Sequence, residues 1–397
     1  MALAAHTASV WGHAHEDTLL RRLLDSAEAS YDPSVSVRAA RRARFDYLAC
    51  AAAGAREAPA ALGPAGRARF DYLACAAAGA REAPAALGPA GRAAFGDLDD
   101  IHWPSMTHLG AIVWATAELA GAGDERLWLA AHMGYEIGGR LGLALGSEHR
   151  RYWHATATAG TVAAAVTAAF CIGADPVRAA AHALSVAGGS ILCILEYTDT
   201  RVLHRYHAVA SGLRCAELAE LSAAEDTLEH PRGFIAATGG SAAGLDGPRP
   251  RTVLEEVSFR RHATSGFNQA AVDVASEFEP IDVAAQAGEI LLDVPDATAA
   301  LAGISNPRTA REAWWSCQHA VAATLLGRDL AVCAVDDSAV SSLRARIRLR
   351  GGSPVTRLTL GGRVVERERA DSLSDADLVA KWRRLVPDLD PPLEMLA

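Results

Sequence analysis

ATATAGTVAAAVTAAFCIGA, residues 155–174, is the stretch of this sequence that decides the fold. No charged side chain interrupts it over about the length that a membrane-spanning helix needs. Its residues are mostly alanine and threonine, however, so the stretch is only weakly apolar. This composition favours a helix buried in a protein core, and we expect no membrane association.

The sequence on either side of this stretch predicts further helices up to about residue 245. Apolar residues recur there at helical spacing, and glycine or proline separates the segments. Helices with many small side chains pack closely and form a large bundle. The additional predicted helices are residues 16–31, 124–145, 175–187 and 203–221.

The pattern changes after Gly247 and Pro248. Strand-like alternation is mixed with helical segments, and Gly361-Gly362 indicates a hairpin turn. We predict strands at 252–259, 355–360 and 363–368, and helices at 306–326 and 374–385. The sequence therefore predicts a mainly α protein. We expect an all-helical domain (residues 1–248), a smaller α+β domain (249–372) and a C-terminal helix (373–397) that returns to the helical domain.

A tandem duplication lies near the N-terminus. Residues 42–66 and 67–91 both read RARFDYLACAAAGAREAPAALGPAG. A repeat architecture needs about three units to bury a shared core, so two identical copies indicate a recent duplication. We expect one copy to fill a core helix position and the other to be accommodated at the surface.

Composition excludes several classes of protein. The 397 residues are 50% hydrophobic and 21% charged, which is typical of a folded globular chain. A net charge of -9 gives no electrostatic basis for binding nucleic acid. The seven cysteines show no C-x-x-C spacing, and the N-terminus lacks the pattern of a secretory signal. We therefore expect a reducing, cytoplasmic location.

Lysine occurs once, at Lys381, so arginine supplies nearly all the basic groups. Arginine stays protonated and forms no Schiff base. We therefore do not expect a pyridoxal-phosphate enzyme, which depends on a core lysine.

Three clusters carry groups suited to chemistry. DLDDIHWPSMTH, residues 97–108, fits a metal site, a helix cap or an acid/base site. His154 precedes the apolar stretch, where a helix N-terminus favours a neutral imidazole, either as proton acceptor or as a structural group. EYTDTRVLHRYH, residues 196–207, mixes arginine with histidine and suits anion recognition or a solvated turn.

Together these strings resemble the MmgE/PrpD superfamily, which includes 2-methylcitrate dehydratase, cis-aconitate decarboxylase and iminodisuccinate epimerase. Segments along most of the chain resemble family motifs in the family's order. They are DLDDIH with the following THLG, GYEIGGRLG (134–142), His154 with Gly160-Thr161, LEYTDTRVLH (195–204), LEHPRGF (228–234), REAWWSCQHAVAATLL (311–326) and the closing LGGRVVER and SDADLVAKWRRL.

The resemblance implies a helical domain with a smaller lid domain, a homodimer, and an active site between the two domains. It implies cofactor-independent proton transfer on small polycarboxylates. His108 and His154 match family positions, and Arg201 stands where many members have lysine. Arg260 falls near a family lysine. His319 falls where the decarboxylase branch has tyrosine, and Tyr206 falls where glycine is common and would reshape the pocket.

From this we predict a lyase of the dehydratase type that acts on a small hydroxylated di- or tricarboxylic acid, without metal or cofactor. The predicted catalytic residues are His108, His154, His319 and Asp99, where the aspartate orients a histidine. The predicted substrate-binding residues are Arg201 and Arg260 as carboxylate clamps, with His204, Tyr206 and His102. The alternatives are an isomerase or epimerase, a decarboxylase, a carboxylate-binding homologue without activity, and a metal-dependent hydrolase.

Overall fold

Helices make up most of the protein, as the sequence predicts, and one four-stranded sheet accompanies them. The computed structural model describes residues 17–32, 87–121, 124–280, 289–368 and 373–385. Residues 42–86 lie outside these ranges, so the expectation about which copy of the duplication fills the core falls outside the described residues.

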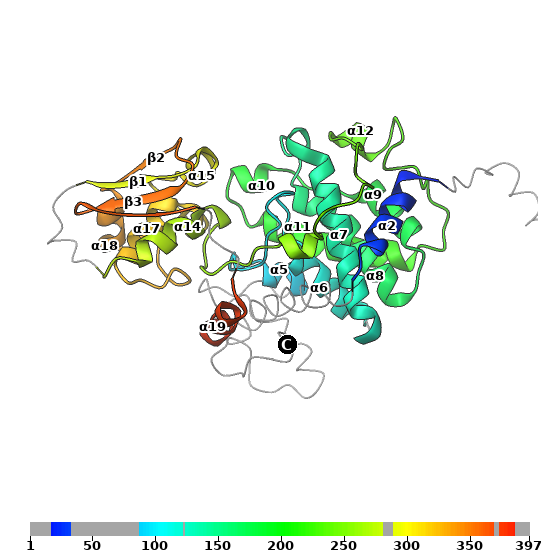
Figure 1. Ribbon diagram of the computed structural model, residues 1–397, viewed down its shortest axis with the longest axis horizontal. Helices are drawn as coiled ribbons and strands as arrows, with labels where there is room; N and C mark the ends of the chain where they lie inside the picture. The colour runs from blue at the N-terminus through cyan, green and yellow to red at the C-terminus, as the bar shows by residue number, and fades with distance from the viewer. Residues whose placement is uncertain (1–16, 33–86, 122–123, 281–288, 369–372, 386–397) are drawn as a thin grey trace, which may run out of the picture.

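The elements from α2 to α13 form what we call the helical part, on the right of Figure 1. The predicted helices 16–31, 124–145, 175–187 and 203–221 are all present with shifted ends. The helices are α2 (Leu19–Ala29), α5 (Gly88–Ala93), α6 (Gly110–Leu119), α7 (Asp124–His149), α8 (Ala155–Ile172), α9 (Pro176–Val186), α10 (Leu192–Leu195), α11 (Thr200–Glu217), α12 (Phe234–Thr238) and α13 (Val253–Glu256).

Helix α8 covers most of the alanine- and threonine-rich stretch of residues 155–174, and it lies at the centre of the helical part. It packs against α6, α7, α9 and α11. Within the described residues it is the one helix long and apolar enough to cross a membrane, and 89% of that span is buried inside the protein. Small residues make the contacts possible, since a Cβ on Gly212 of α11 would lie 2.4 Å from the Cβ of Ala164.

The remaining elements up to residue 367 form the sheet-bearing part. They are η4 (Gly266–Asn268), α14 (Gln269–Ser276), β1 (Ile290–Asp293), α15 (Asp296–Ala302), α16 (Ala310–Trp315), α17 (Cys317–Leu325), α18 (Ser338–Arg344), β2 (Ile347–Arg350), β3 (Thr356–Leu360) and β4 (Arg363–Arg367). The strand order is β2-β1-β3-β4, with β1 parallel to β2 and the other pairs antiparallel. The predicted hairpin is β3–β4, and both of its turn glycines have positive φ.

A separate hydrophobic cluster holds the sheet-bearing part together. Leu292 and Leu358 from the sheet pack with Val321 of α17 and Val274 of α14, all fully buried. Helices α14 and α17 therefore cover one face of the sheet (Figure 1).

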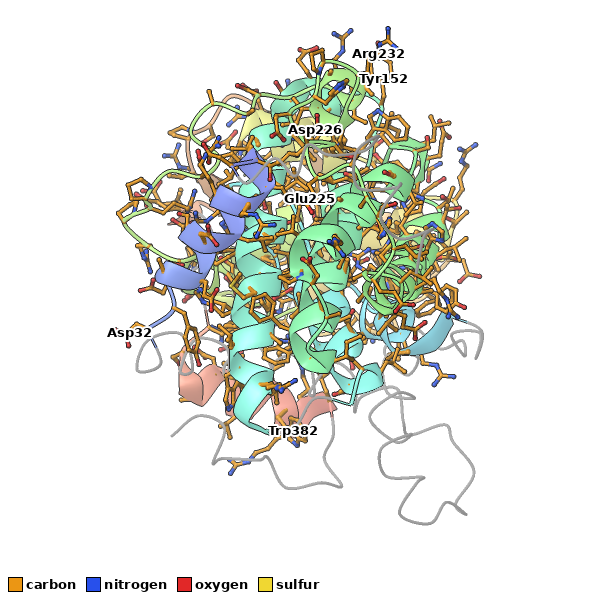
Figure 2. All side chains as sticks on the ribbon, turned by 90° about the vertical axis from the view of Figure 1, so that its right-hand side faces the viewer. Asp32, Tyr152, Glu225, Asp226, Arg232 and Trp382 are labelled. Carbon is orange, nitrogen blue, oxygen red and sulfur yellow. The ribbon has the colours of Figure 1, made fainter. Side chains whose placement is uncertain are left out.

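The C-terminal helix α19 (Asp375–Leu385) packs on the helical part. Leu378 and Trp382 belong to the same buried cluster as Trp114 of α6. The Lys381 Nζ donates to the Leu98 carbonyl at 2.9 Å, so the chain's single lysine links α19 to the 97–108 loop. Figure 2 shows Trp382 at the end of the molecule opposite Tyr152 and Arg232.

Two predicted elements are wrong in part. Residues 252–259 contain the short helix α13 instead of a strand, because Thr252 and Glu255 form a capping box that starts a helical turn. The predicted helix 306–326 is broken at Ser316, whose extended backbone ends α16 and whose hydroxyl accepts from the His319 N–H to begin α17.

Candidate active site

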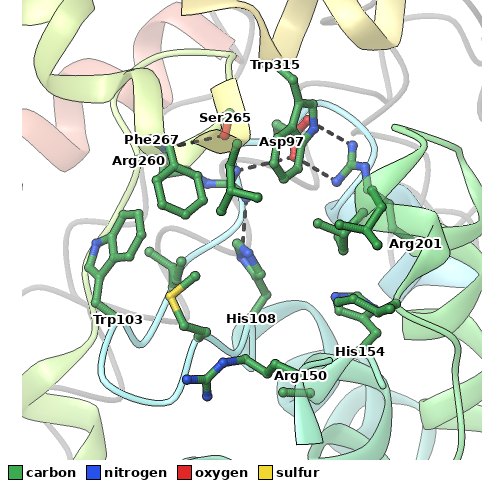
Figure 3. Close-up of a pocket in the computed structure, with 18 of the residues that line it drawn as sticks. Asp97, Trp103, His108, Arg150, His154, Arg201, Arg260, Ser265, Phe267 and Trp315 are labelled. Atoms are coloured by element: carbon green, nitrogen blue, oxygen red, sulfur yellow. Dashed lines mark hydrogen bonds and ion pairs between the residues drawn. The ribbon is translucent and has the colours of Figure 1, made fainter. Parts of the chain in front are cut away.

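A cavity of about 250 Å³ lies where the helical part meets the sheet-bearing part (Figure 3). The 97–108 loop, the start of α8 and the start of α11 supply its charged and imidazole side chains. Phe267, Leu301 and Trp315 of the sheet-bearing part close the opposite side. Apolar surface therefore faces a wall that carries charge, which is the usual composition of a small-molecule site.

We call the arginines of the cavity and the carboxylates that pair with them the charged wall, and Asp97 is the first of these carboxylates. Its two carboxylate oxygens accept from Nη1 and Nη2 of Arg201 at 2.7 and 2.8 Å, and Arg260 and Arg311 lie at 3.4 and 3.6 Å. Its backbone is left-handed, with φ 56°, a conformation that aspartate tolerates better than most residues. Burial alone would raise the pKa of Asp97, but the charges of these arginines outweigh burial and hold the pKa below its ordinary value.

Asp99 is the second carboxylate of the charged wall. It is 2% exposed, it accepts from Arg205 Nε at 3.0 Å, and it also accepts from Arg260 Nη2. Burial again opposes ionisation, and Arg205 and Arg260 overcome it, so the pKa of Asp99 is lowered. Two buried carboxylates and their arginines therefore form one fixed network.

Asp100, next in the loop, caps a helix. Its Oδ1 accepts from the Gly110 backbone N–H at the start of α6, at 2.8 Å, and its Oδ2 accepts from the Tyr135 hydroxyl at 2.6 Å. A Cβ on Gly110 would lie 2.7 Å from that carboxylate, so glycine is required there. The helix-cap interpretation of this loop is thus correct for Asp100.

His108 lines the cavity, and its proton position follows from one contact. Its Nδ1 is 2.6 Å from the Asp100 carbonyl oxygen, which only accepts, so Nδ1 carries the hydrogen and Nε2 carries the lone pair. Asp99 Oδ2 lies 3.6 Å from the same Nδ1, where it would form an ion pair with a protonated ring. The orienting role of Asp99 stays a prediction. Burial lowers the pKa of His108 to about 3; Arg205 and Arg260 act in the same direction, and Asp99 opposes them.

His154 lines the cavity from a different element, at the N-cap of α8. Its Nδ1 lies 3.0 Å from Nδ1 of His204, so one imidazole donates to the other. The Cys193 sulfur is 3.8 Å from the first ring nitrogen and 3.6 Å from the second. Burial lowers the pKa of His154 well below its ordinary value, and Arg205 and His204 add to this effect.

Arg150 is a cavity residue that the sequence analysis did not single out. Among the described residues no carboxylate forms an ion pair with it, in contrast to Arg201, Arg205 and Arg260. Its position in the string HRRYWH, four residues before His154, was the available signal. Asp97 and Arg205 were likewise quoted within strings but not selected.

The structure does not bring all the predicted residues into the cavity. His319 is buried in α17 and its Nδ1 faces Arg344 Nη1 at 3.2 Å, outside the cavity lining. His102 is fully buried in the loop between Ser105 Oγ, at 2.7 Å, and Glu256 Oε2, at 3.0 Å. Neither imidazole has access to a ligand in the cavity, so both placements are corrected.

Tyr206 and His204 belong to α11 but do not line the cavity, in contrast to their predicted roles. Arg201 and Arg205 share one face of α11 because they are four residues apart. Tyr206 lies on another face of this helix, where it is 39% exposed and its ring is directed at Gly88 of α5. Tyr206 therefore does not reshape the cavity. His204 does not line the cavity either, and it reaches the site only through His154.

Arg201 and Arg260 line the cavity, but as partners of Asp97 and Asp99. The sequence suggested carboxylate clamps and named no internal partner for them. The internal pairs fix both guanidinium groups in place, so they act on a ligand as a rigid positive wall.

The helical part matches the model of a known protein family. The model of the MmgE/PrpD N-terminal domain matches residues 20–243, more than half of the chain and nearly all of the helical part. No curated protein matches the chain. The family predicted from the motifs is therefore confirmed, and this chain belongs to the MmgE/PrpD superfamily.

Proposed function

We propose that the protein is a cofactor-independent lyase of the dehydratase type that acts on a small hydroxylated di- or tricarboxylic acid. One observation carries the proposal: a single cavity holds two imidazoles from separate elements together with an excess of positive charge. Among the described residues, four guanidinium groups line the cavity, those of Arg150, Arg201, Arg205 and Arg260, and Asp97 is the carboxylate that lines it. Asp99 pairs with Arg205 and Arg260 from outside the lining, so two carboxylates face four cations. A buried excess of cations favours an anionic ligand.

Arg150 is the group that binds a substrate carboxylate directly in this proposal, because its guanidinium is not committed to an internal ion pair among the described residues. The fixed wall of Arg201 and Arg260 stabilises the negative charge that develops on a carboxylate when the adjacent C–H is broken. Preorganised charge in a site of low dielectric is worth more than the same charge in water.

His108 acts as the general base, since its Nε2 holds the lone pair. It takes the proton of the C–H bond next to a carboxylate, and Asp99 stabilises the imidazolium that forms. The carboxylates of a bound substrate offset the charges of the arginines that, besides burial, lower the pKa of His154, so this ring takes up a proton from solvent as the substrate binds. His154 then donates this proton to the leaving hydroxyl from the other side of the cavity and returns to its neutral form. The C–H and C–O bonds break, the carbon–carbon double bond forms, and water leaves; release of the proton from His108 to solvent restores the starting state.

The two imidazoles also suit the alternative of an isomerase or epimerase. Figure 3 shows His108 and His154 approaching the cavity from different elements, so a proton removed on one face of a carbon could be replaced on another. A decarboxylase, with carbon dioxide as the leaving group, would use the same donor.

We also propose that the helical part and the sheet-bearing part are two domains whose separation admits the substrate. Their hydrophobic clusters are distinct, with Val166 central to one and Val321 to the other. The contacts that join the parts at the cavity are mixed: the Tyr197 hydroxyl donates to the Leu301 carbonyl at 3.1 Å, and the ring of Trp103 packs against that of Phe267 with centroids 5.5 Å apart.

The test is incubation of the purified protein with 2-methylcitrate and related hydroxy acids, with alkene absorbance as the readout. We expect turnover that His154→Ala reduces and that His230→Asn, at an exposed position far along the chain, leaves unchanged. Deuterium entering recovered substrate from D₂O without alkene would favour the isomerase. Equal activity of the parent and His154→Ala, or no reaction with any such acid, would reject the lyase.

A further inference from the structure

Three potential metal ligands converge beside the cavity. They are His154 at the start of α8, Cys193 in α10 and His204 in α11, and their ligand atoms all lie within 4.8 Å of one another. Cys193 is a free, buried cysteine. Within the residues that the structure describes, this is the one group of three histidine, cysteine or carboxylate side chains placed so closely.

The separations suit a single small ion. The two Nδ1 atoms are 3.0 Å apart, and the sulfur lies 3.8 Å from Nδ1 of His154 and 3.6 Å from that of His204. Bonds of about 2.3 Å to sulfur and about 2.0 Å to nitrogen, at tetrahedral angles, place sulfur about 3.5 Å from nitrogen and the nitrogens about 3.3 Å apart. The empty cluster therefore needs shifts of only a few tenths of an ångström.

We propose that His154, Cys193 and His204 form a three-ligand zinc site beside the cavity, with a fourth position left for water or an anion. A thiolate with two imidazoles and no carboxylate selects zinc over magnesium or calcium. A direct hydrogen bond between the two imidazoles explains the 3.0 Å distance between their Nδ1 atoms without a metal. It does not explain why the Cys193 sulfur faces both rings.

The surroundings limit the affinity. Burial raises the pKa of the Cys193 thiol to about 11, so in the empty cluster the sulfur keeps its proton, and zinc displaces that proton to solvent on binding. Arg205 and Arg201 act electrostatically on the same sulfur. Zinc with one thiolate retains a positive charge, which these arginines disfavour, so we expect a chelator to remove the ion readily.

Zinc on Nδ1 of His154 would leave its proton on Nε2, and the imidazole could lose that proton only by becoming imidazolate. His154 then neither accepts nor donates a proton in a catalytic cycle. Occupation of the site would therefore inhibit the reaction; this consequence rests on the proposed function, whereas the zinc site does not.

The experiment uses the full chain, treated with chelator and then titrated with Zn²⁺ by calorimetry and with Co²⁺ by absorbance. We expect one zinc ion per chain from this site and a thiolate-to-cobalt charge-transfer band. Cys193→Ser should abolish the band, and His204→Asn should weaken zinc binding at least tenfold. Cys333→Ser, which changes a cysteine outside the cluster, should leave both signals unchanged.

No cobalt–thiolate band in the parent protein would overturn the proposal, as would zinc binding by His204→Asn as tight as that of the parent. Circular dichroism checks that each variant folds. If Cys193→Ser does not fold, the cobalt spectrum of the parent protein alone still decides the test. Because binding is measured without substrate, a failure of the lyase proposal leaves this result intact. In an active preparation, zinc should inhibit the parent more strongly than His204→Asn.

Discussion

The two sides of the cavity surround their histidines with different chemistry. His108 stands on a charged wall, where the Asp100 carbonyl fixes its proton on Nδ1 and the Asp99 carboxylate lies 3.6 Å away. His154 lies beside a second imidazole and a thiol, and Arg205 and Arg201 are charged groups that act on it. The first histidine therefore has one tautomer, whereas the contact between His154 and His204 allows either ring to be the donor.

This difference separates the roles of two similar side chains. A fixed lone pair suits a base that must be ready before substrate arrives. A proton shared between two rings suits a group that donates and is then reloaded. The comparison also explains why a metal would suit only the side of His154, where two imidazoles and a thiol converge, since Arg205 and Arg260 occupy the space around the Asp99 carboxylate.

The largest expected effect is on turnover. His108→Asn removes the base and should lower kcat by about 10²–10⁴-fold, the usual contribution of a positioned acid or base. His102→Asn is the matched control, because His102 is a buried histidine of the same loop that does not line the cavity. Equal losses in the two variants would mean that the loop structure, and not the base, sets the rate.

The next effect is on stability and tests the charged wall directly. Asp99→Asn leaves Arg205 and Arg260 buried without their carboxylate, so we expect a loss of about 3–5 kcal/mol in the free energy of unfolding. Glu366→Gln breaks the exposed pair with Arg357 and should cost no more than about 1 kcal/mol. Urea denaturation of both variants measures the contrast, and similar losses would show that the buried network contributes no more than a surface pair.

The sequence predicted that His108, His154, Arg201 and Arg260 share one site, but not the side chains that pair with the two arginines. Local patterns sufficed for α8 and for the β3–β4 hairpin, whereas the expectation that His108 and His154 share one site came from the resemblance to the family. The pairing of Asp97 with Arg201 depends on how α11 lies against the 97–108 loop, which no local pattern specifies. Tyr206 was misplaced because a resemblance aligns positions along a chain, whereas the face of a helix depends on a rotation of about 100° per residue.

Arg150 tests how a ligand meets the charged wall. Arg150→Gln should raise KM about tenfold or more with a smaller change in kcat, since a charged hydrogen bond is worth about 1.5–3 kcal/mol. Arg150→Lys should restore part of the affinity. Arg151→Gln is the control, because Arg151 is exposed and pairs with Glu148. A fall in kcat with KM unchanged would assign Arg150 to the transition state instead of to substrate binding.

The smallest effect is a pH dependence of stability that distinguishes the imidazoles from the aspartates. The pKa of His108 is lowered from an ordinary 6.5 to about 3 in the folded protein. As the pH falls, the unfolded chain therefore binds a proton at His108 before the folded protein does. The stabilisation of the folded protein is complete above about pH 6.5 and is lost as the pH falls toward 3. His204, with its pKa lowered to about 4, acts with the same sign. Asp97 and Asp99 have lowered pKa values too, but they start to lose stability only near and below their ordinary range.

Between pH 7.5 and 6, His108 should therefore cost under about 1 kcal/mol, and the aspartates almost nothing. Urea denaturation at the two pH values measures the loss in the parent, and His108→Asn should reduce it. Because an asparagine does not titrate, the remaining slope belongs to the other buried histidines, among them His149, whose pKa is lowered to about 4. An unchanged slope in His108→Asn would mean that His108 keeps an ordinary pKa, and the charged wall would then not hold its histidine neutral in the empty cavity.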